Sequence, residues 1–192
     1  MKLKLTLDEV TPIEYICQPE VERFVSYVLE NFQPNEKKIL VLLPCSAKKP
    51  YASSRTQRKY IQTIKEAAGD KYHLIQEATL SGVLGVVPRE METAEVVLNY
   101  DFPLNRSKYT RGFHMEIMDH VAELVARFVS EFGQDFETII IYGRERYKTV
   151  AQLAKEKACF PIIVLPSSNK RLLGEGLSEL AEAISESVRE LD

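Results

Sequence analysis

The amino-acid sequence predicts an α/β fold: a three-layer α/β/α sandwich with a mostly parallel central sheet. Short apolar runs alternate along the chain with amphipathic stretches at helical spacing. The apolar runs are continuous rather than polar at every second position, which is typical of strands buried on both faces. No repeat or low-complexity linker divides the chain. We therefore expect a single domain over residues 1–192, with 1–36 as an N-terminal extension and helix.

The first half of the sequence predicts two helices and three strands. Pro34 ends the first helical pattern. Ser53, Ser54 and Thr56 can cap the second helix, which should end at Gly69. The expected elements are helices over 19–32 and from these caps to about 68, strands over 39–43, 72–78 and 95–100, and a long connection over 81–93.

The second half repeats the alternation of helices and strands. An apolar stripe that includes Ile117, Leu124 and Phe128 predicts a long helix. Two further apolar runs predict strands, and Gly143 should open the helix between them. These two strands should join those at 39–43 and 72–78 in one sheet, covered on both faces. The expected elements are helices over 112–132 and 176–191 and strands over 138–142 and 162–165.

Charge is distributed unevenly, although the net charge is only −3. Residues 37–65 hold eight lysines and arginines and no acid, whereas 175–192 hold six acids and one arginine. The total charge argues against binding nucleic acid by bulk electrostatics. The basic segment is either a local anion site or a solvated loop and helix face. If it is a site, its RNA binding should be weak and salt-sensitive.

The cysteines and histidines predict neither a disulfide framework nor a metal site. Cys17, Cys45 and Cys159 are widely spaced, no CxxC occurs, and only three histidines are present. We expect free thiols in a reducing compartment, without a metal or cofactor. No apolar run approaches the roughly twenty residues that cross a bilayer, and no signal-type segment follows Met1. These features favour a cytoplasmic protein without a membrane partner.

Reactive side chains are concentrated where the strand over 39–43 should end, in the stretch LPCSAKKPYASS. Such sheets bind ligands at the carboxyl ends of their strands, and residues 143–144 and 166–169 should reach the same edge. Cys45 has no acid nearby, and the lysines and a following helix N-terminus would favour its thiolate, the nucleophilic form. The alternative is a buried structural cysteine. The other two cysteines lack such neighbours.

The remaining side chains of this stretch also have two interpretations. Lys48 and Lys49 could bind phosphate or assist proton transfer, or could simply be solvated. Tyr51 could stack on a base or donate a hydrogen bond. Ser54 could bind an oxyanion or cap the following helix, and Pro50 restricts the loop between them.

A second cluster lies in SGVLGVVPREMETAEVVLNYDFP, over residues 81–103. Gly82 and Gly85 allow a close backbone approach or a positive φ. Arg89 and Glu90 place a fork-shaped donor beside a carboxylate. On charge alone, these two residues would form a surface pair.

Together the two clusters resemble the catalytic core domain of archaeosine synthase, among the archaeal relatives of tRNA-guanine transglycosylase. The family motif reads Pro-Cys, three residues, Lys-Pro-Tyr, two residues, Ser, two residues, His. The stretches LGVVPRE and YDFP resemble its second block. The motif's histidine falls on Gln57, which cannot transfer a proton near neutral pH. The residues that match the first block are Pro44, Cys45, Lys49, Pro50, Tyr51 and Ser54.

The resemblance implies a fold like that of uracil-DNA glycosylases and an archaeal protein of tRNA modification. Members convert the 7-cyano-7-deazaguanine base of tRNA toward archaeosine by adding an amine donor, lysine, to its nitrile. The implied partners are tRNA, bound directly or through a partner subunit, lysine or another amine donor, and other archaeosine-pathway proteins. The implied catalytic residues are Cys45, Lys49, Tyr51 and Ser54. The implied substrate-binding residues are Pro44, Ser46, Lys48, Pro50, Gln57, Arg89, Glu90 and Asp101.

Two departures from the family keep other functions open. One is Gln57, and the other is the expected lack of a transglycosylase-like region and a terminal RNA-binding PUA domain. The first alternative is therefore a non-catalytic base- or RNA-binding module that assists a tRNA-modifying partner. The second is a glycosylase-like or other nucleotide enzyme. For that function Asp101 is the nearest acid, and a turn cap explains its position equally well.

Overall fold

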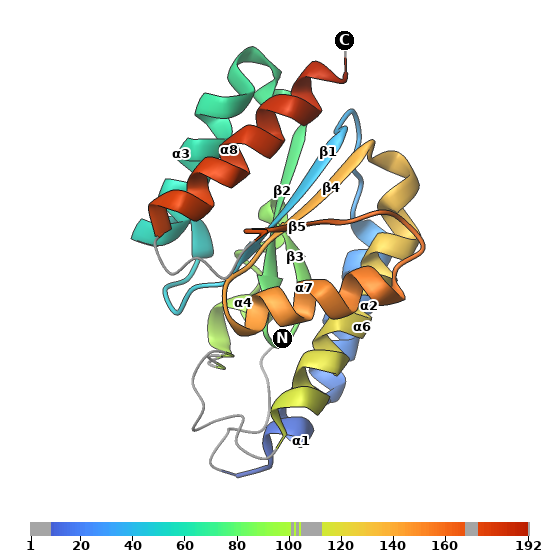
Figure 1. Cartoon of the computed structure of the whole chain (residues 1–192). Coiled ribbons are helices and arrows are strands. Elements are labelled where there is room, and N and C mark those ends of the chain that lie inside the picture. The colour runs from blue at the N-terminus through green and yellow to red at the C-terminus, as the bar shows by residue number, and fades with distance from the viewer. Residues whose placement is uncertain (1–8, 101, 103, 105–112, 168–172, 192) are drawn as a thin grey trace.

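The computed structural model describes residues 9–100, 102, 104, 113–167 and 173–191, and these form one five-stranded sheet between helices (Figure 1). The strand order is β3-β2-β1-β4-β5, so β1 is central. β1 pairs in parallel with β2 and β4, β5 is parallel to β4, and β3 is antiparallel to β2. The strands are β1 (Ile39–Pro44), β2 (Ile75–Ser81), β3 (Gly85–Pro88), β4 (Thr138–Tyr142) and β5 (Ile163–Leu165).

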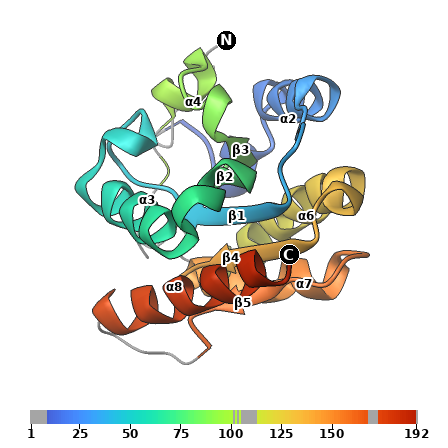
Figure 2. The same ribbon diagram turned by 90° about the horizontal axis from the view of Figure 1, so that it is seen from above.

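Helices cover both faces of the sheet, which confirms the predicted three-layer α/β/α arrangement. Figure 2 shows α3 and α8 on one side of the sheet and α2, α6 and α7 on the other. The helices are α1 (Pro12–Ile16), α2 (Pro19–Asn31), α3 (Arg55–Ala68), α4 (Glu95–Asn99), α6 (His114–Phe132), α7 (Arg146–Lys157) and α8 (Leu173–Arg189). In the part of the chain that the structure describes, no helix has the length and apolar character needed to cross a membrane.

Each face of the sheet has its own hydrophobic core. Side chains point alternately to the two faces of a strand, so Leu40 and Leu42 of β1 enter the larger core, with residues of α1, α2, α4, α6 and α7. Ile39, Val41 and Leu43 enter the smaller core, with residues of α3 and α8. All five side chains are fully buried. β1 is therefore anchored on both sides, and its carboxyl end is held firmly.

The loop after β1 and the start of α3 follow the local sequence signals. The Lys49–Pro50 peptide bond is cis, and the 3₁₀ turn η1 (Tyr51–Ser53) follows it. Ser54 is the N-cap of α3, because its Oγ accepts the backbone N–H of Gln57 at 3.1 Å. Gly69 ends the helix with φ +57°, as predicted. The capping interpretation of Ser54 is thus confirmed.

Two predicted elements are wrong in the segment that follows β2. The strand predicted over 95–100 is the short helix α4. Val96 and Val97 enter the larger core while Leu98 is exposed. The prediction failed because so short an apolar run fits one helical turn as well as a strand. The long connection predicted over 81–93 contains β3 and the 3₁₀ turn η3 (Arg89–Met91).

Boundaries and burial differ from prediction at two other strands. The strand predicted over 72–78 is shifted: a 3₁₀ helix, η2 (Gly69–Leu74), precedes β2. Gly85 opens β3 with φ +69°, and a Cβ there would lie 2.5 Å from the Cβ of Leu124. At the sheet edge, Ile163 of β5 is 43% exposed, so full coverage of both faces does not extend to this strand.

Candidate functional site

Cys45 directly follows β1, at the carboxyl edge of the sheet where sequence analysis expected it. Its backbone N–H donates to the carbonyl of Leu80 in β2 at 3.0 Å, which fixes the start of the loop. Its side chain is half-buried and packs against the larger core. The adjacent cavity has a volume of about 230 Å³ and is lined by Pro44, Cys45, Tyr60, Arg144, Glu145 and Tyr147. The thiol therefore borders a pocket while remaining partly shielded from water.

The sulfur of Cys45 contacts the hydroxyl of Tyr147, a residue 102 positions later in the chain. The Sγ–Oη distance is 2.9 Å, and either atom can be the donor. Tyr147 lies in the first turn of α7 and is only 5% exposed. A thiol and a phenol in hydrogen-bond contact at a cavity wall can exchange a proton.

The turn between β4 and α7 brings Tyr147 to the sulfur. The N–H of Gly143 donates to the carbonyl of Leu165 at 2.8 Å. A Cβ on Gly143 would lie 2.7 Å from the carbonyl carbon of Tyr147, so this close approach requires glycine. Glu145 precedes α7 with φ +54° and ψ −123°, a conformation that glycine tolerates far better than glutamate. The cavity wall is therefore made by a strained turn.

A chain of buried hydroxyls lies behind the Cys45 loop. The Oη of Tyr51 is 2.5 Å from the Oη of Tyr100, which is 2.6 Å from the Oγ of Ser81. The Ser81 Oγ also accepts the backbone N–H groups of Val83 and Leu84, at 3.2 and 3.0 Å. With two donors already directed at its oxygen, Ser81 donates its own proton to Tyr100. The loop is thus tied to the turn after β2.

Lys49 joins the same network. Its ammonium donates to the carbonyl oxygen of Tyr100 and lies 3.1 Å from the centroid of the Tyr100 ring, a cation–π contact. Burial raises the pKa of Tyr51, Tyr100 and Tyr147 well above the ordinary tyrosine value, and the charge that Cys45 would carry as a thiolate raises it further. These three phenols consequently stay protonated at neutral pH.

Gln57, at the position of the motif's histidine, is fully buried and joins two loops. Its Nε2 donates to the carbonyl of Pro44 at 2.6 Å, and its Oε1 accepts from Arg89 at 3.4 Å. Arg89 also donates to Glu77 and Glu92, at 3.1 and 3.0 Å. This brace links the end of β1 to η3. Neither Gln57 nor Arg89 lines the Cys45 cavity.

The other residues predicted to bind substrate lie in different surroundings. Ser46 donates from its Oγ to the carbonyl of Lys48 at 2.8 Å, and the Lys48 side chain is exposed. Glu90 accepts from Gln76 at 3.1 Å and lines another hollow, near the start of β2. Asp101 falls outside the described residues. Of the predicted residues that the structure describes, only Cys45 and Pro44 border the Cys45 cavity.

Sequence reasoning missed the hydroxyl groups of Tyr147, Tyr100 and Ser81. Ser81 and Tyr100 belong to the second sequence cluster, but only the folded chain brings them to Tyr51. A signal for Tyr147 did exist, because the segment after Gly143 was expected at the same sheet edge as Cys45. The partner of a thiol at that edge can be sought among the polar residues that follow each parallel strand.

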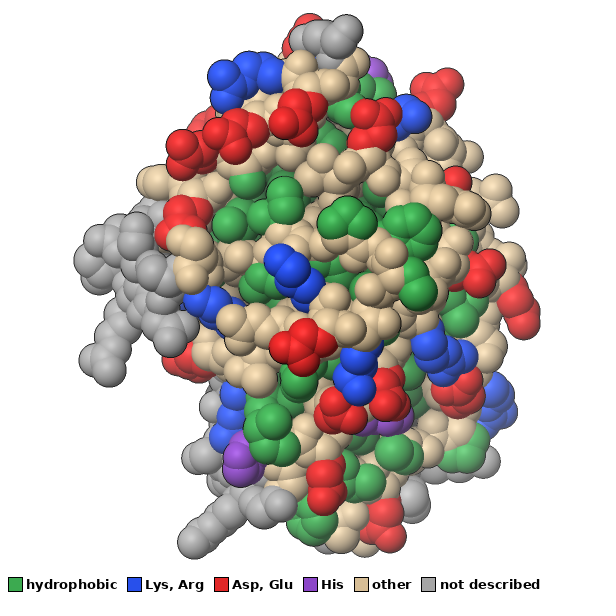
Figure 3. Space-filling model, turned by 45° about the vertical axis from the view of Figure 1, so that its right-hand side comes forward, with side chains coloured by type: hydrophobic (Ala, Val, Ile, Leu, Met, Phe, Trp, Pro, Cys, Tyr) green, Lys and Arg blue, Asp and Glu red, His purple; other side chains and the backbone are tan. Residues whose placement is uncertain are grey.

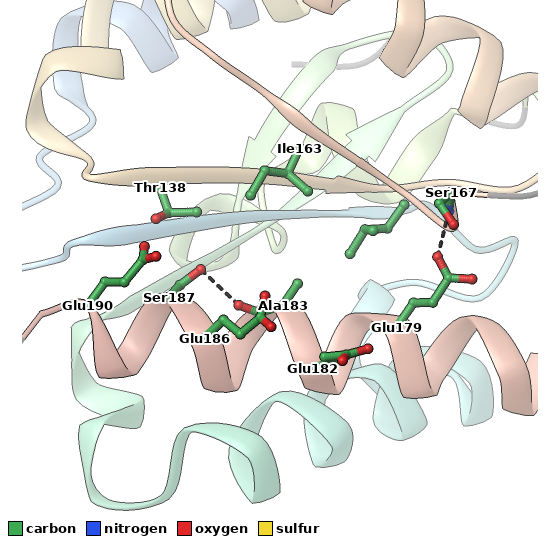
Figure 4. A pocket seen from close by; sticks show the side chains of 10 residues that line it. Thr138, Ile163, Ser167, Glu179, Glu182, Ala183, Glu186, Ser187 and Glu190 are labelled. Atoms are coloured by element: carbon green, nitrogen blue, oxygen red, sulfur yellow. Dashed lines mark hydrogen bonds between the residues drawn. The ribbon is translucent and has the colours of Figure 1, made fainter.

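A second hollow, of about 470 Å³, lies between α8 and the sheet edge. Figure 4 shows Glu179, Glu182, Glu186 and Glu190 of α8 along one side and Ile163 of β5 on the other. In Figure 3 a row of acidic side chains crosses the upper part of the molecule, and others are scattered over the lower part. Across the described residues, no three histidine, cysteine or acidic side chains come together to hold a metal ion. This hollow is lined by acidic side chains along its α8 side.

The fold and the site define an α/β domain with a thiol and buried hydroxyls at the carboxyl edge of its sheet. Residues 21–184 match the model of a family described as a domain of unknown function, DUF5591. The chain belongs to this family.

Comparison with curated proteins identifies similar regions in larger proteins. Archaeosine synthase subunit alpha of Thermococcus kodakarensis is 34% identical over 191 residues, covering 94% of this chain and 32% of that protein. Archaeosine synthase of Methanocaldococcus jannaschii is 29% identical over 168 residues, covering 86% of this chain and 26% of that protein. The chain thus spans about a third or less of these relatives.

A solved structure has a similar fold. The crystal structure of AF0587, a protein of unknown function, matches with a TM-score of 0.59 and 25% sequence identity. The match covers 84% of this chain and 49% of that chain. It supports the α/β arrangement.

Proposed function

We propose that this chain acts in the archaeosine pathway of tRNA modification, as an enzyme or enzyme subunit that adds an amine donor to the nitrile of 7-cyano-7-deazaguanine. The observation that carries this proposal is the contact of the Cys45 sulfur with the Tyr147 hydroxyl at the wall of a cavity. The archaeosine synthase names of two similar proteins support the choice of pathway.

The chemistry of a nitrile suits a cysteine nucleophile. The sulfur of Cys45 would attack the nitrile carbon to give a thioimidate, and an incoming amine, lysine in this proposal, would displace the sulfur. Lys49 and Tyr51 would position the loop that carries Cys45, because their polar atoms bind Tyr100. Ser54 would act through its cap on α3.

The replacement of the motif's histidine is compatible with an active enzyme. Gln57 uses one donor and one acceptor, toward Pro44 and Arg89. A neutral histidine also offers one donor and one acceptor. Position 57 would therefore serve as a neutral bridge, and proton transfer would fall to other groups. This reasoning favours the enzyme over a non-catalytic base- or RNA-binding module.

Transfer RNA would approach along the basic segment over 37–65. Lys48, Arg55 and Arg58 are exposed on the loop and on the first turns of α3, the elements that lead away from Cys45. The acidic groove beside α8 would disfavour phosphate at the other edge of the sheet. Because few basic residues are available, binding should be weak and salt-sensitive, with or without a partner subunit.

The decisive experiment is complementation of cells that lack this gene, followed by mass analysis of tRNA nucleosides. The wild-type chain should restore archaeosine, whereas Cys45→Ala should leave the nitrile precursor in its place. Cys159→Ala is the matched control, because that thiol is exposed and lies outside the cavity. Full restoration by Cys45→Ala would exclude the covalent route and favour the binding module. Normal archaeosine in cells without the gene would exclude the pathway.

A further inference from the structure

Addition of a thiol to a nitrile requires a proton to move between two atoms. The sulfur loses a proton as it bonds to carbon, and the nitrile nitrogen gains one. A nitrogen one bond away from the attacked carbon lies close to the sulfur, so one donor that touches the sulfur can also reach it. Among the described residues, Tyr147 holds the hydroxyl in contact with the Cys45 sulfur, at 2.9 Å. Tyr147 is not part of the sequence motif.

We propose that Tyr147 is a catalytic proton relay between the Cys45 thiol and the nitrile nitrogen of the substrate. The identity of that nitrile rests on the proposed function. The relay itself rests on the sulfur–hydroxyl contact and on the position of both groups at one cavity wall.

The relay balances atoms and charge without any further reactant. The S–H proton of Cys45 moves to the Tyr147 oxygen, the O–H proton of Tyr147 moves to the nitrile nitrogen, and a bond forms between sulfur and the nitrile carbon. The product is a neutral thioimidate, and the phenol is restored. In the second step the neutral amine attacks the same carbon and the carbon–sulfur bond breaks. An amine proton then returns through Tyr147 to the sulfur, leaving an amidine and the free thiol.

The burial of Tyr147 explains why a relay suits this residue better than a simple acid. Burial raises the pKa of the Tyr147 phenol, and the neighbouring Cys45 raises it further, so a phenolate there is unfavourable. A relay avoids the phenolate, because the oxygen gains one proton as it loses another. The other residues of the sequence motif are engaged elsewhere: Lys49 and Tyr51 bind Tyr100, and Ser54 caps α3.

The test compares two electrophiles on the full chain carrying Cys17→Ser and Cys159→Ser, which leaves Cys45 as the sole thiol. 2-Cyanopyrimidine forms a thioimidate and needs a proton on nitrogen, whereas iodoacetamide alkylates sulfur without protonating the reagent. Adduct formation is followed by intact mass. Tyr147→Phe should slow addition to the nitrile about 100-fold relative to alkylation, the usual scale for loss of proton transfer. This relative deficit should persist as the pH rises, because a thiolate formed by solvent base still needs a donor for the nitrile nitrogen.

The control variant is Tyr142→Phe, a buried tyrosine whose hydroxyl has no hydrogen-bond partner among the described residues. It should leave the ratio of the two rates unchanged. Because the ratio is measured on one protein sample, a general loosening of the fold by Tyr147→Phe affects both rates and largely cancels. An unchanged ratio in Tyr147→Phe would overturn the relay, and so would a wild-type Cys45 that is alkylated but never adds to the nitrile. Neither result depends on tRNA. The relay can therefore fail while the assignment to the archaeosine pathway stands, because the complementation experiment tests that assignment separately.

Discussion

β1 and β2 are parallel neighbours buried almost throughout, yet their side chains differ in kind. β1 is apolar at every position, whereas β2 buries Gln76, Glu77, Thr79 and Ser81. Buried polar groups are costly unless they are hydrogen-bonded. Glu77 accepts from Tyr72 and Arg89, Gln76 donates to Glu90, and Ser81 contacts Tyr100.

The difference teaches that two neighbouring strands contribute to the site in separate ways. Apolar packing of β1 against both cores stabilises the sheet and fixes where Cys45 begins its loop. The polar pairs of β2 reach outward and fix the segment over 81–100, which in turn holds Lys49 and Tyr51. Packing is non-directional, whereas hydrogen bonds specify a geometry.

The largest loss of stability is expected when a buried side chain of β1 is truncated. Leu42→Ala removes a fully buried side chain from the larger core and should lower the free energy of unfolding by about 3 kcal/mol, measured by denaturant titration. Ile163→Ala, at the 43%-exposed edge position, is the control and should cost less than about 1 kcal/mol. Equal losses at the two positions would contradict the role assigned to β1.

A smaller loss of stability is expected from substitution of Glu77 in β2, and its effect should be strongly coupled to that of Arg89. Glu77→Ala leaves Tyr72 and Arg89 without their shared acceptor and should lower the free energy of unfolding by about 2 kcal/mol. In a double-mutant cycle with Arg89→Ala, we expect a coupling energy of at least about 1 kcal/mol. Additive effects would mean that the pair does not act as a brace.

The smallest effect is expected at the cap of α3. Ser54→Ala should lower the free energy of unfolding by about 1 kcal/mol, because the N–H of Gln57 loses its acceptor. Ser54→Asn keeps a capping oxygen and should preserve both stability and archaeosine formation in complemented cells. A stable Ser54→Asn protein that forms no archaeosine would instead assign the hydroxyl a catalytic part.

Local signals were sufficient to predict much of the fold. Ile39–Leu43 is continuously apolar, Ser54 and Gly69 delimit α3, and a helical stripe runs along α6. Each of these signals lies within the element it defines. By contrast, the short run of Val96 and Val97 fits either a helix or a strand, and its contacts with the larger core decide for a helix.

The candidate site could be predicted only in part, because its pairs are distant in sequence. Cys45 stands out by its place after a predicted strand, but Tyr147 reaches it across 102 residues. The sequence indicates only that Gln57 cannot transfer protons, whereas its full burial and its hydrogen bonds to Pro44 and Arg89 make it a bridge between two loops. Burial and partner identity arise from tertiary packing, which no single segment encodes.

The backbone of Glu145 sets stability against presentation of Tyr147. A non-glycine residue at φ +54° and ψ −123° stores strain of the order of 1–3 kcal/mol. Glycine at 145 would relax that strain but would also free the turn that delivers the phenol to the sulfur. Selection for heat resistance alone would therefore favour glycine there, whereas selection for a fixed thiol–phenol contact would retain a side chain. At position 145, therefore, the residue that gives the highest folding stability differs from the residue that best fixes the geometry of the cavity.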